Sequence, residues 1–192
     1  GFIGLGIMGK PMVVNLIENG LDVYFFARKK KIINEITKLG GTYIPIIQDL
    51  PKHAQILITN LPDTNDVESV VIGKNGLINN LEKGSIVIDM STISPASSIK
   101  INSQLIKKGS FFLDAPVSGG EAGAISGELS IMVGGNKNAF NKAKDMLSLL
   151  GKKITYIGKS GSGQICKACN QMLVAQTISL ISEVVCVAKK SK

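Results

Sequence analysis

The chain alternates between short runs of apolar residues and longer stretches in which apolar residues recur at helical spacing. Short apolar runs are typical of buried strands, whereas recurrence at three and four residues is typical of amphipathic helices. The first residues predict the end of a strand, a turn and a helix over 8–19. Further strands are predicted over 22–26, 56–59, 85–89, 111–115, 129–133 and 153–157. Further helices are predicted over 30–39, 64–71, 94–108, 138–150 and from 164 to the end, with a helical turn at 48–53.

Two local features refine this pattern. Ser94 followed by Pro95 is typical of a helix start, with the serine side chain as the cap and proline at the first helical position. Residues 117–127 are rich in glycine and other small residues, and they predict a long loop. No glycine or proline occurs after Gly163, so one long helix is predicted, and much of it is apolar on most sides.

Strands that alternate with helices predict an α/β protein of the Rossmann type, with a doubly wound, mostly parallel sheet. We expect residues 1–162 to form a dinucleotide-binding domain and residues 163–192 to form the start of a long interdomain helix. A helix that is apolar on several faces requires packing partners on those faces.

The spacing G-x-G-x-x-G at Gly4, Gly6 and Gly9 is the first sign of function. The first glycine allows a tight turn, the second lets a pyrophosphate approach the backbone, and the third allows close packing of helix on strand. The new helix then offers its positive N-terminal end to the phosphates. An ordinary strand-to-helix turn is the alternative, but the following strand supplies the context that the motif requires.

The end of the second predicted strand bears on the choice of cofactor. A carboxylate there would bind the ribose hydroxyls of NAD, but this strand ends in Ala27 followed by Arg28. A guanidinium can bind a 2′-phosphate with two hydrogen bonds, so Arg28 favours NADP, with NAD still possible. A solvated basic helix start, continued by Lys29 to Lys31, is the alternative.

In a parallel sheet the turns after the strands share one edge, where ligands bind. We therefore expect the glycine turn, Leu61–Pro62, Thr92 and the segment Ser118-Gly119-Gly120 to face one cleft. Backbone N–H groups and the Ser118 hydroxyl could bind an anion such as a carboxylate. A flexible loop without this role is the alternative.

Lys167, Asn170 and Gln171 are spaced three and four residues apart, so they share a face of the long helix. A positioned lysine can protonate the alkoxide that forms when hydride adds to a carbonyl, provided that partial burial lowers its pKa. A solvated surface charge is the alternative reading. Cys166 and Cys169 form C-x-x-C inside this helix, and we interpret them as packed thiols rather than as a redox pair or zinc ligands.

Composition limits the remaining choices. The net charge of +8 favours anionic partners, three cysteines suit a reducing compartment, and the 44% hydrophobic content can fill a sizeable core. We expect a cytoplasmic protein with no membrane partner and no metal site, since no signal peptide or uninterrupted apolar span is visible. A nucleic-acid-binding module or a non-catalytic nucleotide sensor is the rival interpretation.

The chain resembles the β-hydroxyacid dehydrogenase family in four ordered stretches, residues 1–9, 114–120, 131–135 and 163–171, with Leu61–Pro62 and residues 89–92 between them. The resemblance implies that Ser118, Gly119 and Gly120 hold a substrate carboxylate, and that Lys167 is the acid/base with Asn170 beside it. It also implies cofactor contacts from Gly4, Leu5, Gly6, Ile7, Met8, Gly9, Leu61, Pro62 and Thr92.

The implied activity is NADP-preferring reduction of a small semialdehyde that carries a carboxylate, with tartronate semialdehyde to glycerate as the expected reaction. The run from Lys167 to Gln171 favours that substrate, and 3-hydroxyisobutyrate oxidation is the alternative. Family members also have a helical C-terminal domain. The chain stops at Lys192, within what resembles the interdomain helix, so we expect that domain to be absent here and the full-length protein to be a homo-oligomer.

Overall fold

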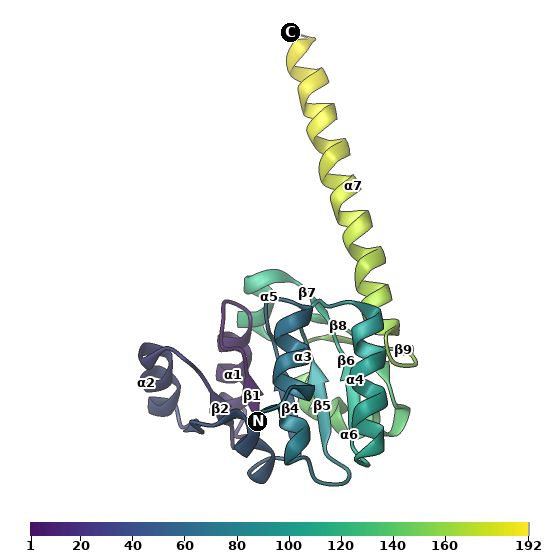
Figure 1. The fold of residues 1–192 in the computed structure, drawn as a ribbon. Helices are drawn as coiled ribbons and strands as arrows, with labels where there is room; N and C mark the ends of the chain where they lie inside the picture. Colours follow the sequence, from purple (N-terminus) through teal and green to yellow (C-terminus); the bar gives the residue numbers. More distant parts are fainter. Residues whose placement is uncertain (192) are drawn as a thin grey trace.

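The computed structural model describes residues 1–191, which form one sheet with helices on both faces and a long C-terminal helix that projects away (Figure 1). The strand order is β3-β2-β1-β4-β5-β6-β8-β7, and β9 pairs with β8. The strands are β1 (Phe2–Ile3), β2 (Tyr24–Phe26), β3 (Thr42–Tyr43), β4 (Ile56–Thr59), β5 (Ile86–Asp89), β6 (Phe111–Asp114), β7 (Val117–Ser118), β8 (Ser130–Gly135) and β9 (Lys153–Gly158).

The helices follow the strands in alternation, and two 3-10 helices lie in the connections. They are α1 (Gly9–Glu18), α2 (Lys30–Lys38), η1 (Ile47–Lys52), α3 (Thr64–Ile72), η2 (Leu77–Asn79), α4 (Pro95–Lys107), α5 (Gly120–Ser126), α6 (Lys137–Ser148) and α7 (Ser162–Lys190). The Rossmann-type fold with a mostly parallel sheet is confirmed, because strands β1 to β6 pair in parallel. Strand β8 runs antiparallel to β6 and β7.

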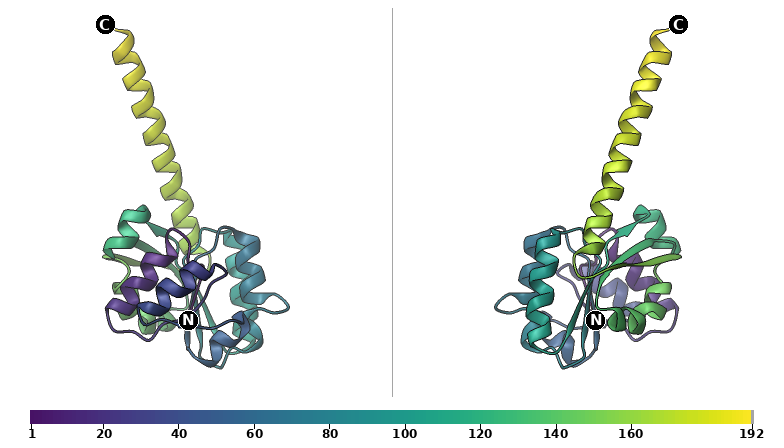
Figure 2. Two further views of the ribbon diagram at one scale, coloured as in Figure 1. Left: turned by 90° about the vertical axis from the view of Figure 1, so that its left-hand side faces the viewer. Right: turned by 90° about the vertical axis from the view of Figure 1, so that its right-hand side faces the viewer.

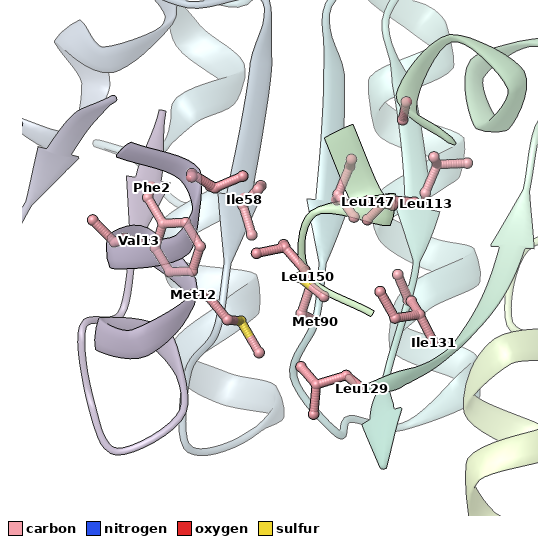
Figure 3. Close-up of a cluster of buried hydrophobic side chains, with 14 of the residues drawn as sticks. Phe2, Met12, Val13, Ile58, Met90, Leu113, Leu129, Ile131, Leu147 and Leu150 are labelled. Carbon is pink, nitrogen blue, oxygen red and sulfur yellow. The ribbon is translucent and has the colours of Figure 1, made fainter. Parts of the chain in front are cut away.

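Side chains that alternate along the strands divide the core into two layers. On one face Phe2, Ile58 and Leu113 pack beneath α1, α2, α5 and α6, and Figure 3 shows part of this cluster. On the other face Leu57 and Phe112 pack beneath α3 and α4. Figure 2 shows these two groups of helices on opposite faces of the sheet.

Two predictions about local structure were wrong. The segment 117–127 is not a long loop, because it contains strand β7 and helix α5. Gly119 and Gly120 have φ values of 136° and 62°, which start α5, and Gly127 ends it with φ 68°. Ser94 lies at the N-cap of α4, but its side chain makes no capping hydrogen bond. Its backbone N–H instead donates to the Thr64 hydroxyl at 3.1 Å.

Helix α7 is anchored only at its start, where Gly163, Gln164 and Lys167 are buried. Its later turns extend beyond the domain and expose their apolar side chains (Figure 1). By length and composition α7 could cross a membrane, since one 18-residue window has a mean hydropathy of 1.6. A helix that is covered by other protein meets the same criteria. The interdomain role of α7 and the absence of a membrane partner stay predictions.

The glycine turn shows why β1 and α1 meet so closely. Gly4 has φ 99°, and a Cβ there would lie 2.0 Å from the Asn60 carbonyl oxygen. A Cβ on Gly9 would lie 2.0 Å from the Gly4 carbonyl oxygen, whereas one on Gly6 would meet nothing within 4 Å. Gly4 and Gly9 are therefore required for packing, and Gly6 leaves open space above the turn.

This difference predicts opposite effects of the same substitution on stability. Gly9→Ala should lower the free energy of unfolding by about 1–3 kcal/mol, because the methyl group must push α1 away from the turn. Gly6→Ala is the matched control and should change it by less than about 0.5 kcal/mol. Urea unfolding measures both values, and equal stabilities of the two variants would contradict this account of the turn.

Candidate functional site

A cleft of about 1160 Å³ opens at the carboxyl ends of β1, β2 and β4. The glycine turn forms its floor, with Gly4, Leu5, Gly6, Ile7 and Met8 all lining it. The first residues of α1 follow directly, so the N-terminal end of that helix faces the same space. This arrangement is what a pyrophosphate requires, and the open space at Gly6 would admit one close to the backbone. The residues present therefore fit a dinucleotide cofactor.

The far side of the cleft is basic. Arg28 is exposed at the end of β2 and lines the cleft together with Lys29 and Lys31. Glu35 of α2 also lines it, but its carboxylate pairs with Lys10 of α1 at 2.6 Å. The hydrogen bond from Lys10 lowers the pKa of Glu35, so this carboxylate stays ionised and paired. Among the described residues, Arg28, Lys29 and Lys31 at this rim form no salt bridge, and such groups are able to bind phosphate.

A second pocket of about 480 Å³ adjoins the first, and Met8, Asn60, Leu61 and Pro62 line both. Lys167 enters this pocket from α7, and the remaining lining residues come from the strand ends and α7: Met90, Ser91, Thr92, Val117, Ser118, Gly119, Gly120, Gln171 and Val174. The structure thus brings the predicted substrate segment, Thr92 and the predicted acid/base together at one end of the cleft.

The environment of Lys167 meets the chemical requirement for an acid/base. The residue is 8% exposed, and burial lowers the pKa of its ammonium. Its Nζ atom donates to Gln171 Oε1 at 2.9 Å, one helical turn away. A lysine with a lowered pKa can both release and accept a proton closer to neutral pH.

Asn170 lies three residues after Lys167 on α7, and the two side chains share one hydrogen-bond acceptor. Its Nδ2 atom donates to the same Gln171 Oε1 at 3.2 Å, and Asn170 does not line the second pocket. Gln171 is therefore the direct partner of the Lys167 ammonium, and Asn170 reaches it only through Gln171. The i,i+4 spacing of Lys167 and Gln171 carried this signal in the sequence.

A buried carboxylate orders the loops that line both pockets. Asp89 Oδ1 accepts hydrogen bonds from Thr59 Oγ1 at 2.8 Å and from Ser91 Oγ at 2.6 Å. Ser91 Oγ in turn accepts from the Leu61 backbone N–H at 2.8 Å. Burial raises the pKa of Asp89 to about 6, against the opposing effect of these hydrogen bonds. Asp89 Oδ2 is buried without a hydrogen-bond partner.

A second buried carboxylate holds the start of α7. Asp114 Oδ1 accepts from the Gly161 N–H at 2.8 Å, and Oδ2 accepts from the Gln164 N–H at 3.1 Å. Burial raises the pKa of Asp114, while the two hydrogen bonds act in the opposite direction. Sequence reasoning did not single out Asp89, Asp114, Gln164 or Asn60. The two aspartates could have been recognised in the sequence, because each is an ionisable residue at the end of an otherwise apolar strand.

Cys166 and Cys169, interpreted as packed thiols, differ in burial, since Cys166 is half-buried and Cys169 is exposed. The interpretation was therefore wrong for Cys169, which lies where α7 leaves the domain surface. Cys186 is also exposed, and none of the three forms a disulfide within residues 1–191. Within residues 1–191 no group of three or more His, Cys, Asp or Glu side chains is arranged to hold a metal ion.

Comparison with known proteins agrees with this site. Residues 1–158 match the family described as the NAD binding domain of 6-phosphogluconate dehydrogenase. The Escherichia coli 2-hydroxy-3-oxopropionate reductase is 41% identical over 191 residues, which cover 100% of this chain and 65% of that protein. The 3-hydroxyisobutyrate dehydrogenase of Mycobacterium tuberculosis, solved with L-serine, superimposes with a TM-score of 0.90 at 31% identity, over 98% of this chain and 64% of that one. Psf3, solved with NADP⁺ and 2-OPP, gives a TM-score of 0.88 at 29% identity, over 95% and 66%.

The chain therefore belongs to the family of NAD-binding domains of the 6-phosphogluconate dehydrogenase type, and the resemblance to β-hydroxyacid dehydrogenases is confirmed. It spans about two thirds of the length of the relatives it matches. The match to an NAD-binding domain favours a nicotinamide dinucleotide ligand over the nucleic-acid partner that the net charge suggested.

The raised pKa of Asp89 predicts how stability depends on pH. Folding raises this pKa from 3.8 to about 6, so the folded protein binds the proton more tightly than the unfolded chain does. The stability that Asp89 contributes is therefore complete below pH 3.8 and is lost as the pH rises through about 6. Asp89→Asn keeps an acceptor oxygen but cannot ionise. Between about pH 4 and about pH 7 the variant should gain roughly 2–3 kcal/mol relative to the wild type.

Urea unfolding at each pH measures this difference. Asp145→Asn is the matched control, because Asp145 is exposed and outside the network. A stability difference between Asp89→Asn and the wild type that does not change with pH would contradict the assignment.

Proposed function

We propose that the full-length protein is an NADP(H)-dependent reductase of small semialdehydes that carry a carboxylate. The observation that carries the proposal is the position of Lys167. This lysine is buried, and it lines the second pocket, which adjoins the cleft above the glycine turn. Tartronate semialdehyde, reduced to glycerate, is the expected substrate, and 3-hydroxyisobutyrate, oxidised, is the alternative.

Lys167 supplies the proton in this reaction. A nicotinamide held in the cleft would supply hydride to the carbonyl carbon, and negative charge would then develop on the carbonyl oxygen. The Lys167 ammonium stabilises that oxygen and donates a proton to it, and in the reverse direction the neutral amine takes the proton from the alcohol. Gln171 orients the ammonium through its 2.9 Å hydrogen bond. Burial lowers the pKa of the Lys167 ammonium, which favours release of its proton.

The segment Ser118–Gly120 suits the substrate carboxylate. It lines the same pocket as Lys167, and neither Gly119 nor Gly120 has a side chain to block the approach of an anion to the backbone. Both glycines have positive φ values, which turn the chain sharply at the pocket wall. A carboxylate held here would leave the aldehyde group, which one carbon separates from the carboxylate in tartronate semialdehyde, within the pocket that Lys167 enters.

The preference for NADP rests on the rim of the cleft. A carboxylate at the end of β2 would select NAD, but this position is the buried Ala27. Arg28 follows it directly and lines the cleft. The NADP⁺ in the Psf3 structure supports a phosphorylated cofactor for a related fold.

The 2-hydroxy-3-oxopropionate reductase of Escherichia coli supports the expected substrate, and the Mycobacterium tuberculosis enzyme supports the alternative. Cytoplasmic location and homo-oligomeric assembly are further parts of the proposal.

Removal of the lysine tests the acid/base role. Lys167→Ala should lower kcat for semialdehyde reduction by about 10²–10⁴-fold, because Lys167 is the only ionisable side chain among the described residues that line this pocket. The dissociation constant for NADPH, measured by its fluorescence, should change by less than about threefold. Lys153→Ala, at an exposed lysine outside both pockets, is the control. Near-normal turnover of Lys167→Ala would rule out the mechanism.

Removal of the arginine tests the cofactor preference separately. Arg28→Ala should raise KM for NADPH by about 10–100-fold through loss of charge-assisted hydrogen bonds, and leave KM for NADH within about twofold. Lys38→Ala is the control, since Lys38 is exposed at the end of α2 that is far from Arg28 and does not line the cleft. Equal use of NADH and NADPH by the wild type would remove the role given to Arg28.

A further inference from the structure

Gln164 connects the two parts of the site and has no role in the chemistry described so far. It lies in the first turn of α7, one turn before Lys167, and is 2% exposed. Its Nε2 atom donates to the Ser91 carbonyl oxygen at 2.9 Å, and its Oε1 atom accepts from the Ile93 N–H at 3.1 Å. The side chain therefore binds the backbone on both sides of Thr92.

The segment that Gln164 holds is also fixed from the opposite direction. The Ser91 hydroxyl and N–H both donate to Asp89 Oδ1, at 2.6 and 3.2 Å. Thr92 is exposed between these anchored neighbours and lines the pocket that Lys167 enters. The position of Thr92 is thus set by Asp89 at the end of β5 and by Gln164 on α7.

Gln164 itself is held firmly at its backbone. Its N–H donates to Asp114 Oδ2 at 3.1 Å, and a Cβ on the neighbouring Gly163 would lie 2.5 Å from the Asp114 carbonyl oxygen. The start of α7 therefore cannot slide along β6 without loss of this packing. Because the start of the helix is rigid, the Gln164 backbone stays in place and its side chain can hold residues 91–93 in a fixed position.

From these contacts we propose that Gln164 is a positioning residue. It fixes the start of α7, and with it the Lys167 ammonium, relative to residues 91–93, which lie on the cofactor side of the pocket. The inference rests on the proposed function, in which Thr92 contacts the cofactor and Lys167 the reacting carbonyl. Occupation of the cofactor cleft then orders the start of α7 as well as residues 91–93, because the two segments share one amide side chain.

The amide of glutamine meets both requirements at this position at any pH. The Ser91 carbonyl requires a donor, the Ile93 N–H requires an acceptor, and both residues are nearly fully buried. Methionine matches glutamine in length but offers neither hydrogen bond. Glutamate offers the acceptor, but it lacks the donor when it is ionised and regains one when it is protonated.

The first experiment compares Gln164→Met with the wild type in the full-length protein. We expect kcat for semialdehyde reduction to fall by about 10–100-fold through misplacement of Lys167, with KM for NADPH changed by less than about threefold. Gln55→Met is the matched control, because Gln55 is exposed beside the start of β4, at the sheet edge opposite the cleft. An unchanged kcat of Gln164→Met would overturn the proposal.

The second experiment uses Gln164→Glu and pH. The ionisable groups in the surrounding network are Asp114, which accepts from the Gln164 backbone N–H, and Asp89, which accepts from Ser91, with Lys167 one turn away on α7. Burial and the two aspartates should raise the pKa of Glu at this position. As the pH falls from about 8 to about 5.5, protonation restores a donor to Ser91, so kcat of Gln164→Glu relative to the wild type should rise. The same ratio for Gln164→Met should stay flat, and parallel behaviour of the two variants would contradict the proposal.

Hydrogen exchange provides a readout that does not depend on turnover. NADPH should slow amide exchange in residues 91–93 and 162–168 of the wild type, but only in residues 91–93 of Gln164→Met. Protection of both segments in the variant would overturn the positioning role. A wild type that shows coupled protection but reduces no semialdehyde would refute the proposed function and leave the role of Gln164 supported.

Discussion

The structure depends most on a row of buried polar side chains at the carboxyl ends of three neighbouring strands. Thr59, Asp89 and Asp114 are in register on β4, β5 and β6, and all three are fully buried. Two adjacent carboxylates are costly to bury, and hydrogen bonds from the surrounding loops offset that cost. Those same hydrogen bonds order the loop at Leu61, the segment at Ser91 and the start of α7. The site is therefore built directly on this row.

The row also explains how a nucleotide cleft and a substrate pocket come to be adjacent. Parallel pairing brings the ends of β1, β4, β5 and β6 to one edge of the sheet, and the buried aspartates fix the turns that follow. Met8 and residues 60–62 then line both spaces. The antiparallel β8 brings Gly134 against the Asp114 carboxylate, where a Cβ would lie only 2.7 Å from Oδ2. A side chain there would displace the group that holds α7.

Local sequence patterns predicted most of the fold, because each strand and helix carries its own periodicity and the glycine spacing is contiguous. What they did not predict depends on contacts between distant residues. Helix α5 is short, and it packs on α1, where Asn15 donates to the Ala124 carbonyl 109 residues away. Gln164 reaches partners more than 70 residues earlier. Lys167 was found from its spacing to Gln171, but the choice of Gln171 over Asn170 as its partner depends on side-chain direction.

The long helix α7 acts as a lever arm whose pivot is its first turn. Its 29 residues extend for roughly 43 Å at the usual rise per residue. A tilt of about 5° at the pivot would displace the far end by about 4 Å while Lys167 moved by less than about 1 Å. The hydrogen bonds from Gly161 and Gln164 to Asp114, together with packing on β8, β9 and α4, thus hold the direction of the whole helix. Any surface that engages the distal turns of α7 is mechanically coupled to the buried carboxylate that holds its first turn.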